Sequence, residues 1–318
     1  MALIGLAAAL AVSLIACGVV FILGPRLGIL DLPDEELKTH TRPIVPLGGV
    51  GVILGLHVGL WAAGVFDAGL LVSTLVVWMI GLADDLRGLS PGVRLLGCAV
   101  AGLTLALMSD VPGGMPHVLI LTVATVVVVN AVNLIDGIDG LAGTVAVASL
   151  SALWWFGTVQ GAVGPDIFVV SIGAILGFLY WNLHPARMFL GDNGAYVIGV
   201  TLTWAALRAS PDTTAGVVGL AIIGVPILDM AVTVARRMIS RRGVVSGDRD
   251  HTYDRLVRSG ISVGVVVSIY VLAEAVWATI IVSTSILAGD LVAILAAVVL
   301  GSALVLTAAI RQSSGHVV

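Results

Sequence analysis

Acidic and amide side chains recur at short intervals in several parts of this sequence, each time where a long apolar run ends. In one such group they occupy every third position: Asn130, Asn133, Asp136 and Asp139. Residues with this spacing lie near one another on a helix. Because such groups are costly beside lipid, they must face protein or a wet cavity. Gly137 and Gly140 would loosen the helix and let a ligand approach its backbone. The pattern predicts an oxygen-rich site, although an array that caps the next helix would look similar.

Asp84 and Asp85 form a second acidic group, adjacent to each other at the end of an apolar run and followed by Arg87. Two carboxylates at a helix C-terminus oppose the helix dipole, which favours cations there. A metal ion, a proton donor or a cationic substrate group would relieve this conflict. Ionisable residues of membrane helices are functional by default, and the alternative here is a solvated helix end.

A third group surrounds Asp192, which precedes an apolar run, and Asn182, which ends the run before it. A carboxylate at the position of Asp192 would cap a helix N-terminus. Capping does not account for Arg187 and Phe189 beside it, a cation and an aromatic ring that suit a phosphate and a nucleobase.

Seven of the fifteen Lys and Arg residues lie in one stretch towards the C-terminal end of the chain. A basic stretch beside a membrane helix would also bind anionic lipid. The part that reads DRDHTYDRL mixes Arg249, His251 and Arg255 with aspartates, which indicates a polar site. Nearer the N-terminus, Lys38 and His40 precede two prolines and a glycine pair, and an ordinary structured loop would explain them equally well.

The apolar runs that carry these groups indicate membrane helices. Hydrophobic residues make up 59% of the 318 residues and charged residues 11%, against about 25% charged in soluble domains. The runs approach the length that crosses ~30 Å of hydrocarbon. We therefore expect one domain, residues 1–318, that is all-α: a polytopic integral membrane helical bundle of about eleven transmembrane helices. The predicted spans are residues 2–23, 47–66, 68–83, 93–108, 118–135, 141–160, 167–183, 194–209, 215–235, 261–283 and 288–310.

The distribution of positive charge predicts the topology. Fourteen of the fifteen Lys and Arg residues fall in or beside alternate connections, and Arg208 is the exception. Cytoplasmic loops carry such an excess, so we expect the N-terminus outside, the C-terminus in the cytoplasm, and the polar groups on the cytoplasmic side. The opposite connections carry scattered aspartates such as Asp67, which we interpret as ordinary solvation. Cys17 and Cys98 match no metal-ligand or redox spacing.

Together, these motifs resemble the polyprenyl-phosphate N-acetylhexosamine-1-phosphate transferases, a membrane family that includes phospho-MurNAc-pentapeptide translocase. The family's markers occur in its order: the Lys38-x-His40 loop with PxGG, the Asp84-Asp85 pair, NLIDGIDGLAG, FLGDNGA, PxxD and DRDH. Eleven spans are more similar to the N-acetylglucosamine-1-phosphate branch than to the translocase. Tyr253 and Asp254 stand where the family pattern has histidines.

The resemblance implies that a UDP-N-acetylhexosamine reacts with polyprenyl phosphate at the cytoplasmic face of the inner (plasma) membrane. The products would be a prenyl-pyrophosphate sugar, which starts cell-envelope glycan synthesis, and UMP. Phosphoryl transfer chiefly needs positioning and charge neutralisation, and hard oxygen ligands favour Mg²⁺, or Mn²⁺. The expected partners are these two substrates and membrane lipids, and no nucleic acid. Whether the chain forms a homodimer is left open.

Roles follow for individual residues from the same resemblance. Asp192 would be the metal ligand, and Asp84 would deprotonate the prenyl phosphate or attack the donor. The other predicted catalytic residues are Asp85, Asp136 and His251. The predicted substrate-binding residues are Lys38, His40, Asn133, Asp139, Asn182, Phe189, Arg249 and Arg255, of which Asn133, Asn182 and Phe189 would hold uridine.

Two other functions fit parts of the pattern. Phospho-MurNAc-pentapeptide transferase activity would use the same motifs. A secondary transporter would also place acids in a helical bundle. Transporters, however, bind their substrates near the membrane midplane, commonly between repeats, whereas these polar residues gather at helix ends and no internal repeat is visible.

Overall fold

Helices account for nearly all of the regular structure. The computed structural model describes residues 1–33, 42–108, 114–162, 166–210, 212–240 and 250–314. These residues form thirteen helices and, apart from two isolated bridges, no strand, which confirms the all-α prediction. The helices are α1 (Ala2–Arg26), α2 (Gly48–Ala62), α3 (Ala68–Arg87), α4 (Pro91–Met108), α5 (Gly114–Ile135), α6 (Leu141–Val159), α7 (Asp166–Asn182), α8 (Gly191–Arg208), α9 (Thr213–Ile222), α10 (Gly224–Ile239), α11 (Thr252–Arg258), α12 (Val263–Ala288) and α13 (Asp290–Ser314).

Every predicted span overlaps a helix, and the ninth overlaps two, α9 and α10. Among the described residues, seven helices are long and apolar enough to cross a membrane, or eight if α9 and α10 form one bent span. The helices α2 and α7 are apolar but shorter. The chain is therefore a multi-pass membrane protein.

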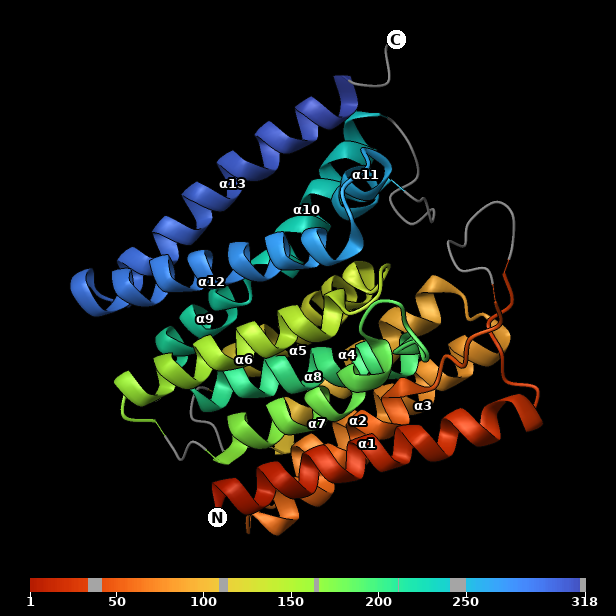
Figure 1. Ribbon diagram of the computed structural model, residues 1–318. Helices are drawn as coiled ribbons and strands as arrows, with labels where there is room; N and C mark the ends of the chain where they lie inside the picture. Colours follow the sequence, from red (N-terminus) through yellow and green to blue (C-terminus); the bar gives the residue numbers. More distant parts are fainter. Residues whose placement is uncertain (34–41, 109–113, 163–165, 211, 241–249, 315–318) are drawn as a thin grey trace.

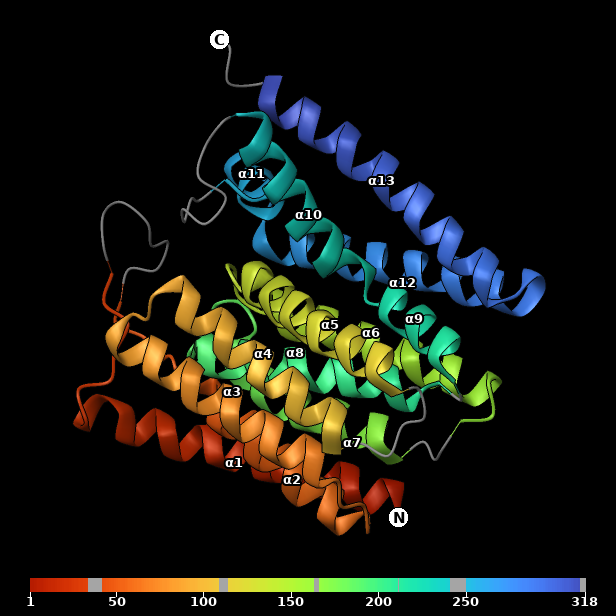
Figure 2. The same cartoon turned by 180° about the vertical axis from the view of Figure 1, so that it is seen from behind.

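The helix α8 runs through the centre of the bundle, whereas α1 and α13 lie along opposite edges (Figures 1 and 2). It packs against α2, α3, α5 and α6, and every residue from Asn193 to Leu207 is buried. Small residues permit this close packing: a Cβ on Gly199 would lie 2.5 Å from the Cα of Val129 in α5. Protein rather than lipid thus surrounds the helix that begins beside Asp192.

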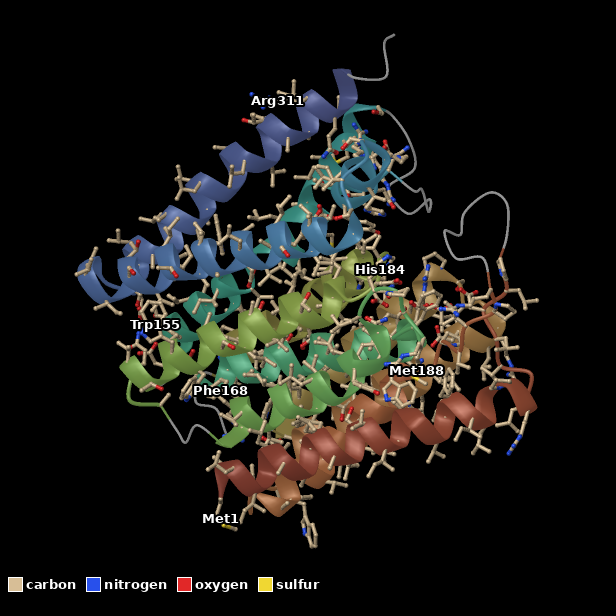
Figure 3. The ribbon with its side chains drawn as sticks, in the orientation of Figure 1. Met1, Trp155, Phe168, His184, Met188 and Arg311 are labelled. Carbon is tan, nitrogen blue, oxygen red and sulfur yellow. The ribbon has the colours of Figure 1, made fainter. Side chains whose placement is uncertain are left out.

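The polar motifs meet at one end of the bundle. The C-terminal ends of α3, α5, α7 and α10 point to the same end as the start of α8 (Figure 1). His184 and Met188 lie at that end, and Met1, Trp155 and Phe168 lie towards the other (Figure 3). The connection before α2 pairs with the one before α8, where Phe189 N donates to Val45 O at 3.0 Å and Gly48 N to Phe189 O at 2.9 Å.

A break between α9 and α10 bends the ninth predicted span by 72°. Bent helices leave backbone groups without helical partners, and α12 supplies replacements. The Glu274 carboxylate accepts from Val225 N at 2.8 Å, and the Trp277 Nε1 donates to Ala221 O at 2.8 Å. A Cβ on Gly224 would lie 2.0 Å from the Trp277 ring. The intramembrane acid Glu274 therefore stabilises a helix break.

Asp67 has a structural role, so its interpretation as ordinary solvation was wrong. Its carboxylate accepts from Leu70 N, at the start of α3, at 2.9 Å. It also accepts from Trp204 Nε1 at 2.8 Å and Arg208 Nη2 at 2.5 Å in α8. This ion pair with Asp67 neutralises Arg208, the one Lys or Arg residue that falls outside the connections predicted to be cytoplasmic.

Candidate active site

A cavity of about 1230 Å³ lies where the polar connections meet. Its walls come from the connections that follow α1, α5 and α7, and from the ends of α3, α8, α11 and α12. Seven predicted site residues line it: Asp85, Asn133, Asp136, Asp139, Asn182, Phe189 and Asp192. Stretches far apart in the sequence therefore contribute to one site.

The remaining predicted residues fall into two groups. Asp84, His251 and Arg255 are described but do not belong to the cavity lining. Lys38, His40 and Arg249 lie outside the described residues, so their proposed roles stay predictions.

Asp84 is buried behind the cavity and has several donors around it. Its carboxylate accepts from Leu89 N at 2.6 Å, from Arg94 Nη1 at 3.2 Å and from the Tyr196 hydroxyl at 3.2 Å. It also lies within hydrogen-bonding distance of the Asp192 carboxyl group. Arg94, at the start of α4, thus provides the cation that the acidic end of α3 was expected to need.

Asp85 caps α8. Its Oδ1 accepts from Asp192 N at 2.9 Å, and its Oδ2 accepts from Asn193 N at 3.0 Å and Asn193 Nδ2 at 2.6 Å. These backbone N–H groups are the ones that a helix N-terminus leaves without partners. The expectation that Asp192 itself caps this helix is wrong, because the cap comes from α3. The Asp192 carboxylate is therefore available for another role.

Several carboxyl groups surround Asp136. Burial, together with the carboxylates of Asp192, Asp85 and Asp139, raises the pKa of Asp136 well above its ordinary value. Within the described residues, no three His, Cys, Asp or Glu side chains are arranged to hold a metal ion by themselves. Asp192 and Asp136 nevertheless offer carboxylate oxygens in a shared cavity. This donor set suits Mg²⁺, which commonly binds through one or two carboxylates plus water and substrate phosphates.

Asp139 and Asn182 join the connection after α5 to the connection after α7. Asp139 Oδ2 accepts from His184 Nδ1 at 2.8 Å and from Ala186 N at 2.9 Å. Asn182 Oδ1 accepts from Gly140 N at 2.9 Å, and its Nδ2 donates to Met188 O at 3.0 Å. Both residues thus shape the cavity wall as well as line it.

The prediction that the four polar residues at every third position share one helix was wrong. The helix α5 ends at Ile135, so Asp136 and Asp139 lie in the turn that follows. The backbone at Gly137 is approached by the protein itself, since a Cβ there would lie 2.0 Å from the Tyr253 hydroxyl. That hydroxyl donates to Leu134 O at 3.0 Å. Gly137 therefore accommodates α11.

Arg187 does not reach the cavity. Its guanidinium lies 4.6 Å from the centre of the Tyr180 ring and 5.1 Å from that of Trp181. Its Nη2 donates to Tyr180 O at 2.8 Å. The expectation that Arg187 would bind a phosphate beside Phe189 is therefore wrong for this structure, because cation–π contacts hold Arg187 on α7.

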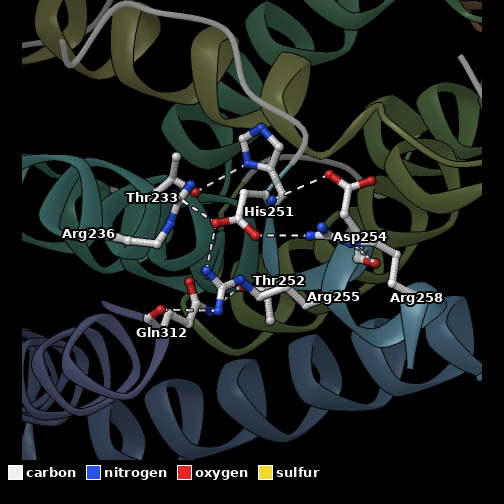
Figure 4. Close-up of polar contacts among 9 residues, drawn as sticks. Thr233, Arg236, His251, Thr252, Asp254, Arg255, Arg258 and Gln312 are labelled. Atoms are coloured by element: carbon white, nitrogen blue, oxygen red, sulfur yellow. Dashed lines mark hydrogen bonds and ion pairs between the residues drawn. The ribbon is translucent and has the colours of Figure 1, made fainter. Parts of the chain in front are cut away.

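The residues around α11 form a second polar network (Figure 4). His251 is buried, its Nδ1 lies 3.2 Å from Thr233 Oγ1, and its ring stacks on Tyr253 with centroids 5.3 Å apart. His251 N donates to Asp254 Oδ2 at 3.3 Å. Arg255 Nη2 donates to Asp250 Oδ2 at 2.6 Å. Asp254 and Arg258 of this helix line the cavity, and Arg258 was not predicted there.

Four residues next to the site were not predicted from the sequence: Arg94, His184, Tyr196 and Arg258. Arg94 and Arg258 were counted only as part of the positive charge that set the topology. His184 had no distinctive spacing, since its partner Asp139 lies 45 positions away. Tyr196 follows Asp192 by four positions, a spacing that would have placed both on one face of α8.

Comparison with known proteins gives the same family as the motifs. The glycosyl transferase family 4 model matches residues 68–210. The chain is 30% identical to decaprenyl-phosphate N-acetylglucosaminephosphotransferase of Mycobacterium tuberculosis, over 82% of this chain and 77% of that protein. It is 27% identical to a probable undecaprenyl-phosphate N-acetylglucosaminyl 1-phosphate transferase of Bacillus subtilis, over 74% and 72%. For an undecaprenyl-phosphate alpha-N-acetylglucosaminyl 1-phosphate transferase of Thermotoga maritima the identity is 28%, over 76% and 77%.

Proposed function

Because this chain belongs to glycosyl transferase family 4, we propose that it transfers N-acetylglucosamine 1-phosphate from UDP-N-acetylglucosamine to a polyprenyl phosphate, with release of UMP. The observation that carries the proposal is the cavity in which three acidic motifs meet at one end of an apolar helical bundle. The names of the relatives support the sugar and the prenyl acceptor.

The walls of the cavity suit two substrates of different polarity. The lining includes the carboxyl groups of Asp136 and Asp192 and the apolar side chains of Ile138, Val257 and Val263. A prenyl phosphate needs both kinds of surface, since its chain stays in the bilayer while its phosphate meets a water-soluble donor. The proposed reaction joins an acceptor phosphate oxygen to the sugar-bearing phosphorus and breaks that phosphorus's bond to UMP.

The chain's own groups position this reaction. Asp192 lines the cavity. Asp84 lies behind it, within hydrogen-bonding distance of Asp192, and Arg94 and Tyr196 donate hydrogen bonds to Asp84. Asp84 would therefore act on the acceptor proton through Asp192. Phe189 lines the same cavity and is proposed to stack on uracil. Mg²⁺ held by Asp192 and Asp136 would supply charge neutralisation for the pyrophosphate.

The reaction is tested directly with purified protein, a prenyl phosphate and Mg²⁺. UMP release and lipid-linked product are followed with UDP-N-acetylglucosamine, other UDP-N-acetylhexosamines and UDP-MurNAc-pentapeptide offered separately. We expect turnover with UDP-N-acetylglucosamine and its loss in EDTA, with recovery when Mg²⁺ is restored. Turnover with the pentapeptide donor alone would favour the translocase activity instead, and full turnover in EDTA would contradict the metal assignment.

We also propose eleven spans, an external N-terminus and a cytoplasmic site in the inner membrane, which the distribution of Lys and Arg supports. Cys17 and Cys98 are buried, so introduced cysteines should label over a low background. In intact cells, an impermeant thiol reagent is expected to label Asp212→Cys but not Ser90→Cys or Ser259→Cys, all three positions being exposed. Labelling of positions 90 and 212 from the same side would show that the number of spans between them is wrong.

A further inference from the structure

The cavity presents a charge problem for the proposed substrates, both of which are phosphate anions. Six aspartates line it: Asp31, Asp85, Asp136, Asp139, Asp192 and Asp254. In the described part of the chain, the Lys and Arg residues of the lining are Arg42, before α2, and Arg258, at the end of α11. Phosphate binding at this wall therefore depends on few fixed cations.

The structure separates Arg258 from Arg255, its neighbour one helical turn away. Arg255 Nη2 donates to Asp250 and its Nη1 donates to Gln312 O at 3.2 Å, and Arg255 does not line the cavity. Arg258 lines the cavity with its side chain 61% exposed. It donates from Nη2 to Asp250 Oδ1 at 2.9 Å and from Nε to Asp254 O at 3.3 Å. Within the described residues its Nη1 makes no hydrogen bond.

Asp250 holds Arg258 in this position through the hydrogen bond from Arg258 Nη2. Besides Arg255 and Arg258, its carboxylate pairs with Arg236 Nη1 at 3.1 Å, and the Arg236 side chain is 2% exposed. Burial alone would raise the pKa of Asp250, but hydrogen bonds from Arg255 and Arg258 outweigh it and hold the pKa below its ordinary value. Asp250 thus stays charged at neutral pH, anchored to α10 through a buried arginine.

We propose that Arg258 is a phosphate-binding residue of this cavity and that Asp250 is the residue that positions it. A guanidinium with one edge held by a carboxylate keeps its other N–H groups in a fixed fork, the geometry that suits phosphate oxygens. The inference rests on the proposed function for its ligands. The phosphate belongs either to the pyrophosphate of the UDP-sugar or to the prenyl phosphate, and Val257 and Val263 beside Arg258 suit the prenyl source.

The test compares Arg258→Gln and Arg258→Lys with Arg311→Gln, a matched loss of charge at an exposed position of α13 away from the cavity. Loss of a hydrogen bond to a charged group corresponds to about a 10- to 100-fold weaker affinity. We therefore expect Arg258→Gln to raise KM for one substrate by about that factor with kcat changed much less. Arg258→Lys should fall between, because a lysine keeps the charge but not the fork.

Equilibrium binding of UMP, UDP-N-acetylglucosamine and a short-chain prenyl phosphate is measured separately on the same variants. Weaker binding of the prenyl phosphate alone assigns the acceptor, and weaker binding of UDP-N-acetylglucosamine assigns the donor. Unchanged binding of all three to Arg258→Gln, or an equal loss in Arg311→Gln, would overturn the inference. Asp250→Asn should weaken the same ligand as Arg258→Gln, and the double variant should lose little more; additive losses would overturn the positioning role. Whether the wild-type protein releases UMP decides the proposed function independently.

Discussion

Asp192→Asn is expected to abolish turnover and leave the protein folded. A bound Mg²⁺ contributes several kcal/mol to stabilisation of a phosphoryl-transfer transition state, so its loss should lower kcat by about a thousandfold or more. The fold should tolerate the amide, because Asp85 and not Asp192 caps α8. The asparagine amide can also donate a hydrogen bond to the Asp84 carboxylate, which in the wild type lies beside the carboxyl group of Asp192.

Asp212→Asn is the matched control, since it makes the same change at an exposed residue near the other end of the bundle. Turnover and the thermal unfolding midpoint are measured on both variants. We expect Asp192→Asn to unfold at the same temperature as the wild type or higher. Substantial turnover by this variant would remove Asp192 as the metal ligand, whereas a lower unfolding temperature would mean that the carboxylate has a structural role.

Gly137→Ala is expected to have the second large effect, through α11. A Cβ at this position would lie 2.0 Å from the hydroxyl oxygen of Tyr253 and 2.5 Å from its Cζ, closer than atoms can pack. The tyrosine must then move and lose its hydrogen bond to Leu134 O. Overpacking and a lost hydrogen bond together should cost about 2 to 4 kcal/mol of folding stability, and activity should fall because Asp254 and Arg258 share this helix.

Gly264→Ala provides the comparison. It lies in α12 with no atom within 4 Å of its added Cβ, so it should keep activity and unfold at or above the wild-type temperature. Tyr253→Ala alone should destabilise the protein, because it removes the hydrogen bond to Leu134 O and the stacking on His251. Gly137→Ala should cost little more in that background, because the clash disappears. If Gly137→Ala alone is as stable and active as the wild type, the contact between α11 and the turn after α5 does not matter.

The role of Tyr253 bears on how the sugar is chosen. If the stretch around His251 reads the sugar, exchanging both Tyr253 and Asp254 for the family's histidines should change the preference among UDP-sugars. Both side chains have structural partners here, Leu134 O for the tyrosine and His251 N for the aspartate. A double histidine variant would therefore change the position of α11 as well as its charge, and the effect on sugar preference stays a prediction.

The helical architecture was predictable because membrane spans follow from uninterrupted apolar length, a local property of the chain. Each predicted span has a helix. The break after Ile222 was not predictable in this way, because Gly224 and Pro226 occur in an apolar stretch whose hydropathy gives no sign of a bend. What stabilises the break is Glu274 in α12, 49 positions from its partner Val225.

The site was predictable as a set of residues more than as an arrangement. The family motifs named Asp85, Asp136 and Asp192, and these three residues line one cavity. Local rules assigned the capping of α8 to the nearest carboxylate in the sequence, whereas Asp85 reaches it from 107 positions away. In the same way, the position of Arg187 over two rings of α7 depends on packing that spacing does not report.

The dependence of the α9–α10 break on α12 has a consequence for how the chain enters the bilayer. During synthesis α9 and α10 leave the ribosome before Glu274 and Trp277 exist, so the N–H of Val225 and the carbonyl of Ala221 then lack their final partners. Exposed backbone groups are costly in hydrocarbon. A nascent chain that stops before α12 should therefore keep α9 and α10 inside the insertion machinery, and their release into lipid should await the emergence of α12.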